Sequence, residues 1–252
     1  VVSALRCDAV DGLGWIFEVW RLFVKAPGIW IVILVIYIII SMILLFIPIV
    51  GALANALFTP VLVGGMLFGA AALDRGETLE IAHLFRGFQD QDRMGPLVLL
   101  GAISVAGYVL IALVIMVFLG GGVILGATLD STGVLVPPEA ASGLFVGAGL
   151  VVALIVLVIS FAVAMALFYG VPLVMLGGQN AWPAAQDSVV ACWINMLPLL
   201  VFGLVYLVLA VAAVIPLGLG FLVLGPVTVC AVYASYREIF GGSAPTLVKL
   251  SK

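Results

Sequence analysis

The side chains that could do chemistry in this chain are few, and none of its long apolar stretches contains Asp, Glu, Lys, Arg or His in its interior. His83 is the only histidine, and no Ser or Cys lies near it in sequence for it to activate as a general base. Cys7, Cys192 and Cys230 are far apart and form no metal-ligand spacing, so reduced thiols are expected. We therefore predict that the chain is not an enzyme and binds neither a metal nor a cofactor.

Asn55, Thr59 and Ser160 are the candidates for a polar site within the apolar stretches. Thr59 lies one helical turn after Asn55 and directly before Pro60, so one interpretation is a small site at a broken helix, as in transporters. The other, which we favour, is that Asn55 bonds to a neighbouring helix and Thr59 satisfies the carbonyl that Pro60 frees.

All nine cations fall on one side of a six-span membrane topology, and cytoplasmic loops are enriched in Lys and Arg. This pattern predicts that both termini are cytoplasmic. Five of the cations next to the spans are expected to form a collar that contacts anionic lipid headgroups, or else to serve orientation only. The collar residues are Arg21, Lys25, Arg75, Arg86 and Arg93.

The composition excludes a soluble globule. Hydrophobic residues make up 66% of the 252 residues, charged residues only 8%, and the mean hydropathy is +1.44. A soluble domain carries about 25% charged residues to hydrate its surface. The net charge of −3, without any basic face, does not suggest nucleic-acid binding.

The apolar stretches predict an all-α, polytopic membrane protein whose six transmembrane helices form three hairpins. The predicted spans are residues 29–47, 51–73, 97–119, 143–176, 199–215 and 220–236. The fourth is too long for one bilayer crossing, so we expect either that its first turns project beyond the bilayer or that the helix tilts and bends near Pro172. Segment 120–142 has two acids and no cation, and we expect an irregular outside loop; a re-entrant segment, a short surface helix and a partner-docking loop are all open.

Each hairpin is preceded by an amphipathic segment, at residues 11–25, 78–90 and 182–196, which predicts a helix in the cytoplasmic headgroup layer. In the second, Ile81, Leu84, Phe85 and Phe88 share one face, with Glu80, His83, Gly87 and Asp90 on the other. The pattern divides a single integral membrane domain, residues 1–252, into repeats at about 11–75, 77–177 and 180–240. Gly65 and Gly69 form a GxxxG pair that predicts close internal packing.

Three stretches carry a resemblance to a known family: Gly14-Trp15 through Leu22-Phe23 to Ala26-Pro27; Leu73-Asp74-Arg75-Gly76-Glu77 with His83-Leu84-Phe85; and Tyr233 through Tyr236-Arg237-Glu238-Ile239-Phe240. Together they resemble a proteobacterial family of six-span inner-membrane proteins of unknown function. More distantly, the layout is similar to the membrane domain of some glycerophosphodiester phosphodiesterases. The resemblance implies a fold and a bacterial inner membrane, with no catalytic residue to carry over.

The sequence thus favours a non-catalytic inner-membrane protein that acts by binding, either as an accessory or scaffold subunit or as a lipid-interacting factor. Its expected partners are the phospholipid bilayer and a membrane protein, which could be a second copy of the chain. The alternative is a transporter or permease for a lipid or a small apolar molecule.

Overall fold

The computed structural model describes residues 19–132 and 138–241, leaving out the side chains of residues 123–132 and 138–145. The described residues are predominantly helical and contain no strand. Residues 19–25 are helical, and the rest of the predicted helix at 11–25 lies outside the described residues. The elements that follow are α2 (Pro27–Leu45), α3 (Val50–Asp74), the 3₁₀ helix η1 (Ile81–Phe85), α4 (Arg86–Gln89), α5 (Gln91–Thr132), α6 (Pro138–Phe168), α7 (Gly170–Met175), α8 (Ala181–Ile194), α9 (Met196–Val214) and α10 (Phe221–Ile239).

Several of these helices are those of a membrane protein. By length and composition, five helical segments of the described chain could cross a bilayer: Pro27–Leu45, Val50–Asp74, Gln91–Gly122, Val146–Met175 and Met196–Val214. The predicted sixth span, α10, is not among them, because Arg237 and Glu238 in its last turn lower its mean hydropathy.

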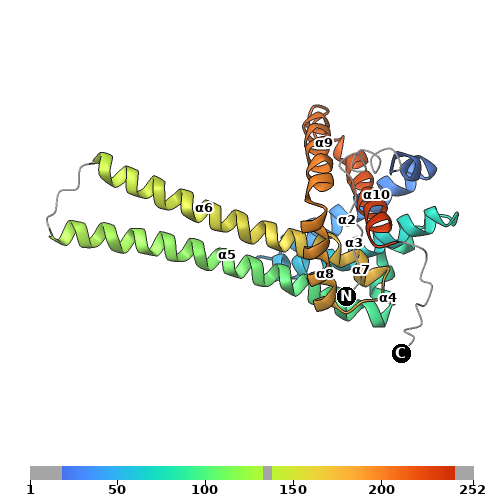
Figure 1. Cartoon of the computed structure of the whole chain (residues 1–252), viewed down its shortest axis with the longest axis horizontal. Helices are drawn as coiled ribbons and strands as arrows, with labels where there is room; N and C mark the ends of the chain where they lie inside the picture. Colours follow the sequence, from blue (N-terminus) through green and yellow to red (C-terminus); the bar gives the residue numbers. More distant parts are fainter. Residues whose placement is uncertain (1–18, 133–137, 242–252) are drawn as a thin grey trace. The chain divides into compact units, whose positions relative to one another are not determined.

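The described chain forms two compact units, and Ile103–Ala164 make up unit 2. In unit 2, α5 and α6 run alongside one another (Figure 1), and Gly107 faces Val163 closely enough that an added Cβ would lie 2.6 Å from its Cγ2. Unit 1 holds the remainder, with α3 at its centre: α3 contacts α2, α7, α10, η1 and α4. As a result, 67% of the 18-residue apolar stretch that could cross the bilayer in α3 is buried inside the protein. The corresponding share is 11% in each of the other four candidate spans.

Glycines explain why α3 can be central. A Cβ on Gly65 would overlap the backbone of Leu84, and one on Gly69 would lie 2.7 Å from Leu79 Cδ1. The prediction that this GxxxG pair serves internal packing is therefore confirmed. Its partner is the segment from Leu79 to Arg86 rather than another membrane span.

The same packing corrects the predicted amphipathic helix at 78–90. Residues 77–80 have no regular structure, and η1 and α4 together span only Ile81–Gln89. Gly87, assigned to the polar face, is buried against the Val61 backbone, whereas Ile81 and Phe85 are exposed. The prediction failed because close backbone contact with α3, not a lipid surface, decides which side of this segment is covered.

The predicted irregular loop at 120–142 is also wrong over most of its length. Helix α5 continues through Gly120-Gly121-Gly122 to Thr132, and α6 begins at Pro138, so only residues 133–137 lie outside the described helices. A helix satisfies every backbone polar group internally, which outweighs the cost of about 1 kcal/mol per glycine when the surroundings are apolar.

Two turns share one sequence feature. In each, an Ile-Pro pair is followed by an aliphatic residue at positive φ: Ile49 at 64° after Pro48, and Leu217 at 54° after Pro216. A β-branched or bulky residue in this region is strained. The two turns differ in their hydrogen bonds, because Val50 N–H donates to Pro48 O in the first and Leu219 N–H donates to Pro216 O in the second. These turns join α2 to α3 and α9 to α10, the first and third of the predicted hairpins.

Candidate functional site

The charged residues of unit 1 meet where α3 ends. Asp74, the last residue of α3, accepts hydrogen bonds from Tyr233 Oη at 3.0 Å and from Arg237 Nη1 at 2.7 Å. Tyr233 and Arg237 are four residues apart on α10, so one helical face presents both donors. This pairing fixes the C-terminal ends of α3 and α10 beside each other.

Lys25 completes the end of α3. Its Nζ donates to the carbonyl oxygen of Leu73 at 3.0 Å, one of the last four carbonyls of the helix, which also accepts the backbone N–H of Gly76. A cation there also interacts favourably with the helix dipole. Arg21 lies one turn earlier on the same exposed face of the helix at residues 19–25, whose buried face is Val19, Leu22 and Phe23.

Two further cations are paired with acids close in sequence. Arg75 Nε donates to Glu77 Oε1 at 2.7 Å, and Nη2 contacts Oε2 at 3.4 Å. The hydrogen bond to Arg75 lowers the pKa of Glu77 and in return raises the pKa of Arg75. Arg93 Nε lies 3.0 Å from Asp90 Oδ2.

A second group of basic side chains packs around the aromatic ring of Phe68 on α3. The guanidinium carbons of Arg75 and Arg86 lie 5.6 and 5.4 Å from its centroid, and the His83 ring meets it edge-on at 5.5 Å. His83 Nδ1 accepts the backbone N–H of Glu80 at 3.2 Å, and the Glu80 side chain accepts the backbone N–H of His83 in return. This capping box holds the imidazole in place.

Five of the six cations of the described residues therefore gather near one end of α3, and Arg21 lies one helical turn before Lys25. The six are Arg21, Lys25, Arg75, Arg86, Arg93 and Arg237. The five predicted collar residues are all in this set, and Arg237 is a sixth member that sequence reasoning left out. The four-residue spacing of Tyr233 and Arg237 was the available signal for it. Chemically, such a group offers fixed positive charge and guanidinium donors for an anion.

A different polar arrangement closes the break between α6 and α7. Ser188 on α8 accepts the backbone N–H of Tyr169 at 3.0 Å and donates to the carbonyl oxygen of Met165 at 2.5 Å. In an unbroken helix, Tyr169 N–H would bond Met165 O directly, so the hydroxyl is inserted into the helix ladder. The bend predicted near Pro172 thus falls three residues earlier, and no signal in the α6 sequence indicates Ser188.

The predicted polar site within the spans is only partly assembled. Thr59 Oγ1 donates to Asn55 O at 2.7 Å, and not to Ala56 O, the carbonyl that Pro60 leaves without its usual donor. Gly101 on α5 lies close to that carbonyl instead; an added Cβ would be 2.9 Å from Ala56 O. Ser160 is exposed and belongs to unit 2, so a site joining all three residues stays a prediction.

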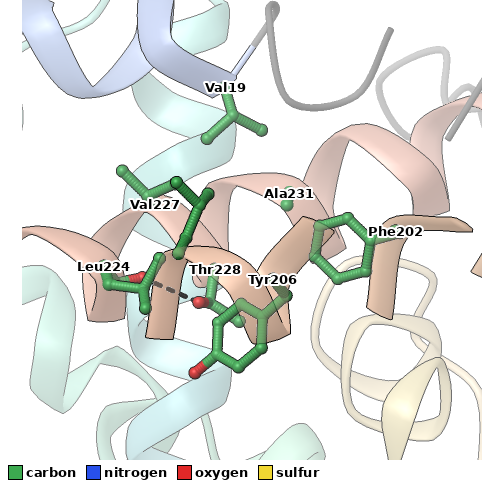
Figure 2. Close-up of a pocket in the computed structure, with 8 residues that line it drawn as sticks. Val19, Phe202, Tyr206, Leu224, Val227, Thr228 and Ala231 are labelled. Carbon is green, nitrogen blue, oxygen red and sulfur yellow. Dashed lines mark hydrogen bonds between the residues drawn. The ribbon is translucent and has the colours of Figure 1, made fainter. Parts of the chain in front are cut away.

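An apolar hollow lies between α9, α10 and the helix at residues 19–25 (Figure 2). The Thr228 hydroxyl is turned back to Leu224 O at 2.7 Å, so it is not available to a ligand. None of the three predicted intramembrane polar residues lines the hollow. Its lining residues are Val19, Phe202, Tyr206, Leu209, Leu224, Val227, Thr228 and Ala231.

Within the part of the chain that the structure describes, no three His, Cys, Asp or Glu side chains are grouped so that they could hold a metal ion. The long apolar helices and the charged end of α3 define the class as an all-helical, multi-pass membrane protein. Comparison with protein-family models, with curated proteins and with solved structures finds no match for the chain.

Proposed function

We propose that the chain is a six-span protein of the bacterial inner membrane with both termini in the cytoplasm, and that α10 is its sixth span. The clustering of five of the six cations near one end of α3 supports a single cytoplasmic face. Helix α8 supports the same face, because it buries small residues and exposes Trp182 (65%) and Trp193 (68%). Tryptophan is enriched in the headgroup layer.

The protein acts by binding rather than by catalysis, as a lipid-interacting factor or as an accessory or scaffold subunit. The observation that carries this proposal is that Arg75 and Arg86 are held over the Phe68 ring while their side chains remain exposed. A rigid basic rim next to apolar helices matches an anionic bilayer surface. The shared Ile-Pro turns add support for the proposed internal repeat.

The topology is tested with single cysteines at Asp130 and Arg86 in a chain whose Cys7 is replaced by serine. Intact cells treated with an impermeant thiol reagent should label the cysteine at position 130 and leave the one at position 86 unlabelled until the membrane is opened. Cys192 and Cys230 are buried and give little background. Labelling at position 86 in intact cells would overturn the proposed orientation.

The permease alternative is favoured by one observation, the discontinuous α6–α7 segment, since broken helices form the substrate sites of many transporters. Purification in mild detergent separates the two functions. A stoichiometric protein partner supports the subunit proposal. Uptake or flipping of a labelled lipid by the purified chain in vesicles, abolished by substitutions at Asn55 and Thr59, supports the permease.

A further inference from the structure

Two guanidinium groups lie over the ring of Phe68, which sets it apart from the other aromatic residues that the structure describes in unit 1. Both guanidinium carbons are about 5.5 Å from one centroid, so they are no more than about 11 Å apart. The ring attracts a cation through its π face, and stacking leaves the N–H groups of a guanidinium free at the edge of its plane. The ring therefore holds the two cations without consuming their donors.

Arg86 keeps the most donors. It is exposed, and among the described residues no carboxylate lies within ion-pair distance of it. Arg75 uses Nε and Nη2 on Glu77 and retains Nη1. A guanidinium has five N–H donors in a fixed fork, which matches the oxygen atoms of a phosphate.

We propose that this site, formed by Arg86 and Arg75 on the Phe68 ring, binds a phosphate group, and that it is the point at which the chain recognises anionic phospholipid. The proposal rests on the proposed lipid-binding function and assigns it to particular residues. Arg86 provides paired hydrogen bonds, Arg75 a second positive charge, and Phe68 the fixed platform. Arg75 follows Phe68 by seven residues, so it lies on the same side of α3 and nearer the end of the helix.

Lys25 and Arg93, two of the other collar cations, have structural roles instead. Lys25 caps α3, and Arg93 is engaged by Asp90. Binding an anion at either would require breaking a contact that orders the protein. The structure therefore separates Arg75 and Arg86, which form the anion site, from Lys25 and Arg93, which support the fold.

The test is native mass spectrometry of the full chain in mild detergent, titrated with phosphatidylglycerol or with zwitterionic phosphatidylcholine. R86Q should weaken phosphatidylglycerol binding about fivefold, the effect of one cation near an anionic lipid. R86K keeps the charge without the planar fork and should remain about threefold weaker than the wild type. R93Q is the matched control and should change binding by less than about twofold, because Asp90 already neutralises Arg93.

Replacing Glu77 provides a test in which phosphatidylglycerol binding is expected to become tighter rather than weaker. E77Q removes the acid that occupies Arg75 and should tighten phosphatidylglycerol binding about two- to fivefold. D90N also removes one negative charge and frees a cation, but that cation is Arg93, which does not lie over the Phe68 ring, so D90N should leave binding at the site unchanged. Equal tightening by E77Q and D90N would mean that only net charge matters, and would overturn the site.

The remaining outcomes separate this site from the function it rests on. Equal weakening by R86Q and R93Q, or none by R86Q, overturns the site while a wild-type preference for phosphatidylglycerol leaves lipid binding standing. A wild type that binds both lipids equally overturns both proposals. Inorganic phosphate distinguishes the source of the ligand. If millimolar phosphate displaces phosphatidylglycerol from the wild type but not from R86Q, the site takes a soluble phosphate ligand. If phosphate does not displace the lipid, the ligand is the lipid headgroup.

Discussion

Replacing Ser188 with alanine removes the hydroxyl that bridges the α6–α7 break. The variant leaves the buried Tyr169 N–H without its acceptor and Met165 O without its strongest donor. An unsatisfied buried N–H costs about 1–3 kcal/mol, and the lost second bond adds about 1 kcal/mol. Met165 O keeps a weak contact from Cys192 Sγ at 3.7 Å. We therefore expect a loss of about 2–4 kcal/mol in the free energy of unfolding.

For a chain of this size, 1 kcal/mol shifts the melting temperature by about 2–4 °C, so S188A should melt about 4–16 °C below the wild type in the same detergent. Ser235→Ala is the matched control. Ser235 is equally buried, but its hydroxyl donates only to Val232 O in its own helix. Equal melting temperatures for the two variants would refute the inserted hydroxyl, because both lose one buried oxygen and only S188A breaks the ladder.

Two further predictions concern buried positions of unit 1. Gly65→Ala should lower the free energy of unfolding by about 1–3 kcal/mol, because the new Cβ meets the backbone of Leu84. Gly203→Ala is the control: a Cβ there would have no atom within 4 Å, so this variant should be neutral or slightly stabilising. Equal effects of the two variants in thermal melts would contradict the close packing. Burial raises the pKa of the Cys192 thiol to about 12, so it stays protonated from neutral pH up to mildly alkaline pH. Maleimide should therefore modify Cys192 only after denaturation, and labelling of the folded protein at pH 8 would show that the α8 packing is open.

The sequence predicted α3 to within one residue at each end, as 51–73 against Val50–Asp74. Its limits are local signals: the Ile-Pro turn before it and the charged run that starts at Asp74. The ends of α5 could not be predicted in the same way, because Gly120-Gly121-Gly122 normally indicates a loop. Only the gain from internal hydrogen bonding in apolar surroundings makes these residues helical.

The candidate site was predictable as a set of residues and not as an arrangement. Arg75 and Arg86 were recognised as cations near a span, but the role of Phe68 depends on η1 crossing α3 at Gly65. The link between Asp74 and Arg237 joins positions 163 residues apart, and no local pattern specifies such a pair. The three sequence stretches that carried the family resemblance do contribute to this junction, through Lys25, Asp74 and Arg237.

That long-range pair has a consequence for biosynthesis. Asp74 is made 163 residues before Arg237, so the acid at the end of the central helix is synthesised well before the arginine that it binds. Lys25, by contrast, precedes α3 in the sequence and can bind the Leu73 carbonyl as soon as α3 has formed. The end of α3 therefore gains its contacts in two stages, and the Asp74 carboxylate acquires its hydrogen bonds from Tyr233 and Arg237 only after α10 has been made.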